Sequence, residues 1–172
     1  MKRQDNYTVA FLGDCVLSDK TGEKLIDPIV EKIVMTRKKV EFCICKADGF
    51  SFAASRAVRR VQEKLGKECC CLHYMLFNEP TIEQRRRLEK VYDLVEVLDS
   101  DISASKEVFD IYGNLSAAKR GLSHSKNGVN TACIKNLVLK SNLLFGVQDD
   151  PIINFAKDNS IPVCELRYDM NW

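Results

Sequence analysis

The sequence predicts an α/β fold in three layers, with a mostly parallel sheet of five or six strands between two layers of helices. Strand-like runs alternate with helical segments along most of the chain, which is the order that builds parallel sheets through right-handed crossovers. Several of the strand-like runs are apolar almost throughout, as expected for strands covered on both faces. The chain has 172 residues, of which 45% are hydrophobic and 29% charged. This size and composition are typical of one soluble domain with a substantial core.

The first predicted elements are a strand and a helix. Tyr7–Leu12 is strand-like and ends at Gly13. Asp27 followed by Pro28 is a helix-start signal, because a capping residue is followed by a proline at the first helical position. The predicted helix fades at residues 36–39, and its buried stripe consists of Ile29, Val30, Ile33 and Val34.

The stretch from Val40 to Leu65 is predicted to be the centre of the fold. Val40–Cys45 is apolar and too short for a helix, which indicates a buried interior strand. A break follows in which Asp48 is a good candidate for a helix N-cap. After it, apolar residues recur at helical spacing from Phe50 to Leu65. The turn between such a strand and helix is where open α/β sheets bind ligands, beside the positive end of the helix.

The second half of the chain continues the alternation. We predict a strand at 67–76, a charged helix at 81–92, a strand at 93–98, a helix at about 130–141, a strand at 142–147, a helix at 151–159 and a last strand at 161–166. Within this single domain of residues 1–172, residues 99–130 form a long irregular insertion with a basic tip at 118–128. Long irregular segments in compact domains are usually functional or disordered, so we expect this insertion to be the most mobile part of the chain.

The composition indicates which binding partners and which cellular compartment to expect for this protein. The net charge of +2 is too small to favour nucleic acid as a partner. No apolar run reaches membrane-spanning length, and the first residues lack the apolar core of a signal peptide. Seven of the eight cysteines lie in apolar runs and no C-x-x-C pair occurs, so we expect reduced, mostly buried cysteines, no metal site and a cytoplasmic protein. His73, on a buried strand, is interpreted as a hydrogen-bonded core histidine.

Two stretches resemble the SLOG superfamily, which includes the lonely-guy cytokinin-activating phosphoribohydrolases. The stretch Gly49-Phe50-Ser51-Phe52-Ala53-Ala54-Ser55-Arg56-Ala57-Val58 resembles the family's G-F-D-x-L-A-x-x-A-V. The stretch from Ile134 to Phe145 resembles a late family element in which an R-N-x-x-[ML] helix leads through S-D into a strand. The resemblance covers roughly residues 9–166. It implies a Rossmann-like fold, a small stand-alone bacterial protein and a pocket for a nucleotide-type ligand.

The sequence also departs from the family at its ligand loops. Cys45-Lys46 stands where the family usually has Gly-Gly, and Ser51 replaces an acidic residue. Gly13 is followed by Asp14 instead of the family's G-[HY]-R, and Gln148-Asp149-Asp150-Pro151 replaces a second glycine-rich loop. Glycine lets backbone N–H groups approach a phosphate closely, which a side chain obstructs. The catalytic pattern P-G-G-x-G-T-x-x-E is absent, so the resemblance does not imply the hydrolase activity.

The predicted strand ends and the resemblance together define a candidate ligand site, with no catalytic residue assigned. Most of its members follow the carboxyl ends of predicted strands, which meet at one edge of a parallel sheet. Ser51 belongs to the first turn of the central helix, and Asn136 to the late helix. The candidate residues are Gly13, Asp14, Lys46, Ala47, Asp48, Gly49, Ser51, Asn136 and Asp149.

Each polar candidate also has a purely structural interpretation. Lys46 binds a phosphate or is a solvated loop lysine. Ser51 donates to an anion or acts as a second cap. Asp14 accepts from a ribose hydroxyl or a base, or only ends a strand. Asp149 and Asp150 form a carboxylate pair near the site or, as is more common before proline, cap a helix.

Three functions remain open, and the leading one is binding. In the first, the protein binds a nucleotide or nucleotide-derived small molecule without catalysis or with weak catalysis, and needs no cofactor. In the second, it is a nucleotide hydrolase of phosphoribohydrolase type that cleaves an N-glycosidic or phosphate bond. In the third, it is a protein or nucleic-acid interaction module whose pocket has decayed. The sequence leaves a homodimer open.

Lys46→Ala tests the predicted anion contact. Hydrogen bonds to charged groups contribute roughly 1.5–3 kcal/mol each. We therefore expect the substitution to weaken an anionic ligand about tenfold or more while leaving the free energy of unfolding nearly unchanged. Titration calorimetry with both proteins measures the affinities, and equal affinities would contradict the role given to Lys46.

Overall fold

The structure is a computed structural model that describes residues 6–13, 15–45, 48–98, 124–148 and 150–167, with only the backbone of 124–130 and 132. Its strands are β1 (Tyr7–Leu12), β2 (Val40–Ile44), β3 (Cys70–Leu76), β4 (Leu94–Val97), β5 (Leu143–Val147) and β6 (Val163–Leu166). Its helices are α1 (Asp19–Leu25), α2 (Asp27–Thr36), α3 (Gly49–Leu65), α4 (Ile82–Leu88), α6 (His124–Lys140) and α7 (Pro151–Asp158). A short 3₁₀ turn, η1 (Lys67–Cys69), follows α3.

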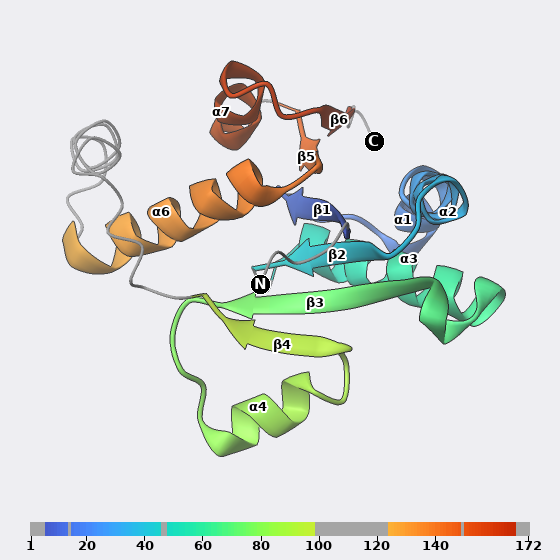
Figure 1. Cartoon of the computed structure of the whole chain (residues 1–172), viewed down its shortest axis with the longest axis horizontal. Helices are drawn as coiled ribbons and strands as arrows, with labels where there is room; N and C mark the ends of the chain where they lie inside the picture. The colour runs from blue at the N-terminus through green and yellow to red at the C-terminus, as the bar shows by residue number, and fades with distance from the viewer. Residues whose placement is uncertain (1–5, 14, 46–47, 99–123, 149, 168–172) are drawn as a thin grey trace.

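The six strands form one sheet in the order β4-β3-β2-β1-β5-β6, and every neighbouring pair is parallel. In Figure 1 the strands follow one another from β4 near the bottom to β6 at the top. The α/β fold with a parallel sheet of five or six strands is therefore confirmed. The interior position of β2 is confirmed as well, because Phe42 pairs with Val9 of β1 on one side and Leu72 of β3 on the other.

The alternation of side chains along the strands divides the core between two helical layers. On one face, Phe11 of β1 contacts Phe42, Phe50 and Phe145, with ring centroids 5.3–6.3 Å apart, and α2 and α3 cover this cluster. On the other face, Ala10 and Leu12 pack against α6 and α7, together with Cys43, Cys45, Leu137, Val138, Ile153 and Ala156. A three-layer, Rossmann-like arrangement results.

One helix was not predicted from the sequence. α1 begins after Ser18, whose side chain accepts a hydrogen bond from the Thr21 N–H at 3.2 Å. It has only seven residues, and the one that is buried is Gly22. Since a glycine contributes nothing to an apolar stripe, helical periodicity gives no signal here. A Cβ at Gly22 would meet the Cβ of Ala53 in α3 at 3.5 Å, so this face of α1 lies close to α3.

Three predicted boundaries were wrong by three residues or more. The third strand begins at Cys70 and not at residue 67, because Gly66, with φ of 102°, turns the chain into η1 first. The charged helix predicted at 81–92 ends at Leu88. The late helix begins at His124, so residues 124–130 of the predicted irregular insertion are helical. The remainder of that insertion lies outside the described residues.

All eight cysteines are free thiols. Cys43, Cys45, Cys70 and Cys133 are buried and the other four are half-buried, so reduced cysteines agree with the prediction, while only half of them are fully inside. None of the described helices combines the length and the apolar character that crossing a membrane requires.

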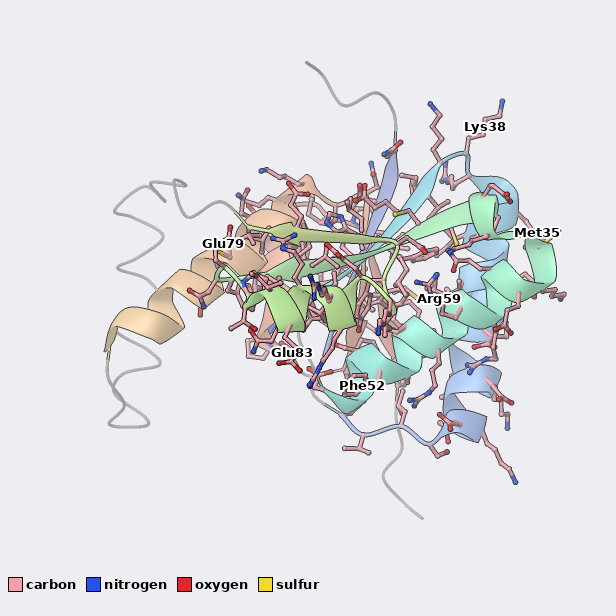
Figure 2. All side chains as sticks on the ribbon, turned by 90° about the horizontal axis from the view of Figure 1, so that it is seen from below. Met35, Lys38, Phe52, Arg59, Glu79 and Glu83 are labelled. Carbon is pink, nitrogen blue, oxygen red and sulfur yellow. The ribbon has the colours of Figure 1, made fainter. Side chains whose placement is uncertain are left out.

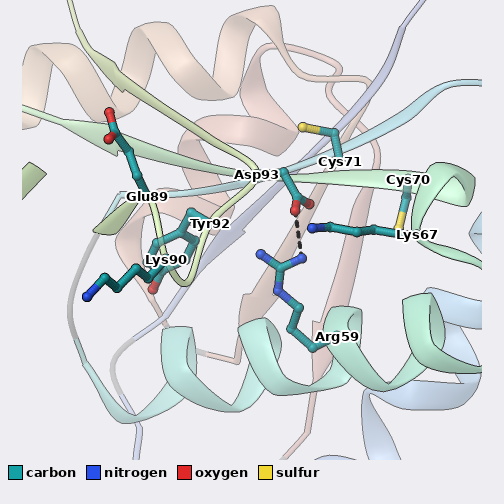
Figure 3. A pocket seen from close by; sticks show the side chains of 8 residues that line it. All are labelled: Arg59, Lys67, Cys70, Cys71, Glu89, Lys90, Tyr92 and Asp93. Atoms are coloured by element: carbon teal, nitrogen blue, oxygen red, sulfur yellow. Dashed lines mark hydrogen bonds and ion pairs between the residues drawn. The ribbon is translucent and has the colours of Figure 1, made fainter. Parts of the chain in front are cut away.

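A polar network fastens α3 to the amino ends of β3 and β4. Figure 2 shows Arg59 about midway along α3, and Figure 3 shows its guanidinium turned toward Asp93. Arg59 Nη1 donates to Asp93 Oδ1 at 2.7 Å. Asp93 Oδ2 accepts from Gln62 Nε2 and from the Leu72 N–H, each at 2.8 Å. One carboxylate thus joins a helix and two strands.

The network sets the protonation of its carboxyl group. Partial burial by itself raises the pKa of Asp93, but hydrogen bonds from the Leu72 N–H, Gln62 and Arg59, with the charge of Arg59, outweigh it and lower the pKa below its usual value. The folded protein therefore favours the ionised form more strongly than the unfolded chain does.

Asp93→Asn should lower the free energy of unfolding by about 1–3 kcal/mol at pH 7, because hydrogen bonds to a charged acceptor are weakened. The depressed pKa gives stability that is present above the unfolded value near about 3.9 and is lost as pH falls through the lower folded value. The difference between wild type and variant should therefore hold from neutral pH to about 5 and shrink below about 4. Urea unfolding across this pH range measures it, and a difference that stays constant on acidification would contradict the assignment.

Candidate functional site

The strand order places a reversal of direction beside β1. From β1 the chain adds β2, β3 and β4 on one side, and then returns to add β5 and β6 on the other side of β1. Leu12 at the end of β1 pairs with Gly146 near the end of β5. In open α/β sheets, ligands bind outside the carboxyl ends of the strands at such a reversal. The candidate site is therefore the edge where β1 and β5 end.

Gly13 closes the packing at this edge. It is buried, and a Cβ at this position would lie 2.4 Å from Val147 Cγ2 and 3.0 Å from Phe50 Cδ1. Gly13 thus lies where the ends of β1 and β5 meet the first turn of α3. The structure supplies a packing reason for this glycine, in addition to the ligand approach predicted from the sequence.

The first turn of α3 is capped by the protein itself. Asp48 Oδ1 accepts from the Ser51 N–H at 2.8 Å, which confirms Asp48 as the N-cap. Ser51 is 2% exposed. A Cβ on Gly49 would lie 3.0 Å from the Cys15 carbonyl oxygen and from Val16 Cα, so the segment after β1 passes directly beside this turn. The predicted segments do lie together, but the Asp48 carboxylate and the Ser51 N–H are engaged in capping.

A pocket of about 140 Å³ opens at the same edge, on the opposite face of the sheet. It lies between α6 and the start of α7, above the end of β1, and its lining residues are Leu12, Thr131, Ile134, Lys135, Asp150, Pro151 and Ile152. Asp150 Oδ1 accepts from the Ile152 N–H at 3.0 Å and so caps α7. The capping interpretation of the aspartates before Pro151 is thus confirmed for Asp150.

Lys135 gives this pocket its cationic group. The residue is 5% exposed although it carries an ammonium group, and Nζ lies 4.8 Å from the centroid of the Phe155 ring of α7. Burial lowers the pKa of Lys135 because it disfavours the charged form. A cation over an aromatic face gains roughly 0.5–2 kcal/mol. The pocket lining therefore holds a buried lysine side chain and the Asp150 carboxylate beside apolar residues.

The predicted site residues are only partly accounted for. Asn136 follows Lys135 in α6 and is half-buried, but it is not among the described residues that line the pocket. Asp14, Lys46, Ala47 and Asp149 lie outside the described residues.

The sequence analysis missed Lys135 and Thr131. They are four residues apart, so they share one face of α6. Lys135 also interrupts a stripe that includes the buried Cys133, Leu137 and Val138. A lysine at a helical position whose neighbours on the same stripe are apolar was the signal in the sequence that could have identified Lys135.

A larger hollow lies at the opposite edge of the sheet. It encloses about 360 Å³ near the amino ends of β3 and β4, and Figure 3 shows its lining residues: Arg59, Lys67, Cys70, Cys71, Glu89, Lys90, Tyr92 and Asp93. Arg59 is bound to Asp93, to Gln62 and to the Val91 carbonyl oxygen. Because Arg59 is already bound within the network that supports α3, we interpret this hollow as part of the scaffold.

The fold and the site define a class: an open, parallel, Rossmann-like α/β protein with a charged pocket where the strand order reverses. Comparisons with protein-family models, with curated proteins and with solved structures find no match to this chain. The resemblance to the SLOG superfamily thus rests on the residues quoted for it and stays a prediction.

Gly13→Ala should lower the free energy of unfolding by about 1–3 kcal/mol, because the added methyl group would overlap Val147. Gly22→Ala is the matched control. A Cβ at Gly22 would meet Ala53 at an ordinary 3.5 Å, and alanine favours a helix by roughly 0.5–1 kcal/mol over glycine. Urea unfolding of both variants measures the contrast, and a Gly13→Ala protein as stable as wild type would show that the strand ends are not packed this tightly.

Proposed function

We propose that this protein binds an anionic, nucleotide-type small molecule at the edge where β1 and β5 end, and that Lys135 receives the anionic group. The observation that carries the proposal is the pocket at the reversal of strand order, with a lysine that is 5% exposed in its wall. Pockets with a few convergent polar groups and perturbed titratable residues at such reversals are the usual ligand sites of open α/β proteins.

Removal of the Lys135 ammonium group from water affects how strongly it attracts an anion. An ammonium group removed from water loses hydration, and the lowered pKa of Lys135 reflects that loss. An anionic group that enters the pocket meets this ammonium group where little water screens their charges, so the attraction is stronger than at the protein surface.

The size of the pocket indicates which part of the ligand enters it. About 140 Å³ is less than the roughly 300–1,000 Å³ of typical small-molecule pockets. We propose that a phosphate or phosphosugar end occupies the space beside Lys135 and that the rest of the ligand extends along the strand ends past Gly13. The nucleotide class itself comes from the SLOG resemblance.

The proposal stops at binding. Asp150 is the one carboxylate among the described residues that line the pocket, and one of its oxygens is engaged in capping α7. A glycosidic or phosphate hydrolase needs a positioned acid or base, and nothing in the lining favours Asp150 for that role over capping.

A thermal-shift screen with nucleoside monophosphates, cyclic nucleotides and ADP-ribose tests the proposal. A ligand at a hundred times its dissociation constant adds about 2.7 kcal/mol of stability and raises the unfolding midpoint. Lys135→Met should weaken the best ligand about tenfold or more, since charge-assisted contacts contribute roughly 1.5–3 kcal/mol. Its folded state should remain stable, because methionine fills a similar volume without a buried charge.

Lys140→Met is the control, since Lys140 belongs to the same helix but is exposed and outside the pocket lining. It should bind the ligand as wild type does. A screen in which no compound shifts the midpoint at millimolar concentration would refute the proposed function. Equal affinity of wild type and Lys135→Met would refute this placement of the anionic group.

A further inference from the structure

Three residues with different metal-ligand atoms meet in the interior of the sheet. A carboxylate oxygen of Glu41, the sulfur of Cys43 and a ring nitrogen of His73 all lie within 4.8 Å of one another. The strand register explains the cluster. Cys43 of β2 pairs with His73 of β3, and Glu41 precedes Cys43 by two residues, so all three project from the same face. The sequence led us to expect no metal site, and the proposed function does not involve this group.

His73 is the buried centre of the cluster. It is 0% exposed, and its Nδ1 is hydrogen-bonded to Glu41 Oε1. Its Nε2 lies 3.4 Å from Glu96 Oε2 of β4, yet it has no hydrogen-bond partner among the described residues. The prediction of a hydrogen-bonded core histidine therefore holds for only one of the two ring nitrogens. A buried polar atom without a partner is destabilising, so its presence in a folded protein needs an explanation, and an ion that the structure does not contain is one.

Cys43 is not suited to be a nucleophile. It is 1% exposed, and burial, followed by the nearby Glu41 carboxylate, raises the pKa of Cys43 well above its usual value. Reactive cysteines are thiolates in electropositive, partly exposed surroundings. A nucleophilic Cys–His pair is thereby disfavoured, while a metal ion can hold a buried sulfur as thiolate.

We infer that Glu41, Cys43 and His73 form a site for a zinc-type divalent cation that clamps β2 to β3. Zinc combines sulfur, imidazole and carboxylate ligands, whereas magnesium and calcium prefer oxygen alone. Zinc–ligand bonds of about 2.0–2.3 Å place neighbouring ligand atoms roughly 3.3–3.8 Å apart in a tetrahedron. The three ligand atoms, which all lie within 4.8 Å of one another, are near the spacing that this geometry requires.

The charges and protons of the site balance. Binding at Nδ1 moves the ring proton to Nε2, which lies 3.4 Å from Glu96 Oε2, and a small movement of Glu96 lets its carboxylate accept a hydrogen bond from Nε2–H, as is common behind a metal-bound histidine. Cys43 releases its thiol proton to solvent. The two negative charges of Glu41 and the thiolate then neutralise the 2+ ion, so no net charge is buried.

Metal titration of the full chain tests the inference. Protein freed of metal with a chelator is titrated with Zn²⁺ in a non-thiol reducing buffer, and bound metal is counted after gel filtration. We expect one equivalent per chain and a higher unfolding midpoint with excess zinc. Substitution with Co²⁺ should give the visible absorption of tetrahedral coordination and a thiolate-to-cobalt band in the near ultraviolet.

Variants identify the ligands. Cys43→Ser and His73→Gln should each weaken Zn²⁺ binding at least about 100-fold, and Glu96→Gln roughly 10–100-fold, as is typical for a partner behind a ligand. Cys164→Ser, at the β6 edge of the sheet, is the matched control and should bind as wild type does.

Failure of the wild type to retain stoichiometric zinc, a cobalt spectrum without a thiolate band, or equal affinities of Cys43→Ser and Cys164→Ser would each overturn the site. The wild-type stoichiometry and cobalt spectrum decide the matter even if a variant does not fold. None of these readouts depends on nucleotide binding, so the two proposals fail separately.

Discussion

The contacts of Phe11 hold the two halves of the sheet to the central helix. Its ring meets Phe42 of β2, Phe145 of β5 and Phe50 at the start of α3. Aromatic pairs at these separations contribute roughly 0.5–1.5 kcal/mol beyond the area that they bury. Because Phe11 precedes the end of β1 by one residue, the same contacts fix the strand ends around which both the Gly13 packing and the Lys135 pocket are arranged.

The two faces of the sheet differ at this edge. On the α3 face, Asp48 places a carboxylate at the helix N-terminus, Ser51 is buried, and the chain near Val16 passes close to Gly49. On the α6–α7 face there is a pocket with a buried cation. Helix N-termini attract anions, but at the start of α3 the Ser51 N–H already donates to the Asp48 carboxylate. This contrast is why we propose an anion contact beside Lys135, while the contact predicted for Lys46 in the turn before α3 lies outside the described residues.

The sequence predicted those features of the fold that depend only on residues close together along the chain. The apolar run of β2, the cap at Asp48 and the proline after Asp150 each carry their own explanation within a few positions. Long-range features had no such signal. The hydrogen bond between the side chains of Glu41 and His73 depends on the register between β2 and β3, and the burial of Lys135 depends on how α6 meets α7. Neither relation is contained in periodicity or composition, so both became visible only once the strands and helices were placed.

The position of β1 has a consequence for how the chain reaches its folded state. Its neighbours are β2, about 30 residues later, and β5, whose entry is marked by a hydrogen bond from the Thr8 N–H to Asn142, 134 positions away along the chain. Closing so long a loop is entropically costly and slows folding. During synthesis, β1 to β4 can associate while the β5 side of β1 still lacks its partner, so an unpaired strand edge remains exposed until the last third of the chain is made. Chaperones should therefore be needed most while β1 lacks its β5 partner. The exposed edge of β1, which could pair with another chain during this time, is the edge beside which the ligand pocket later forms.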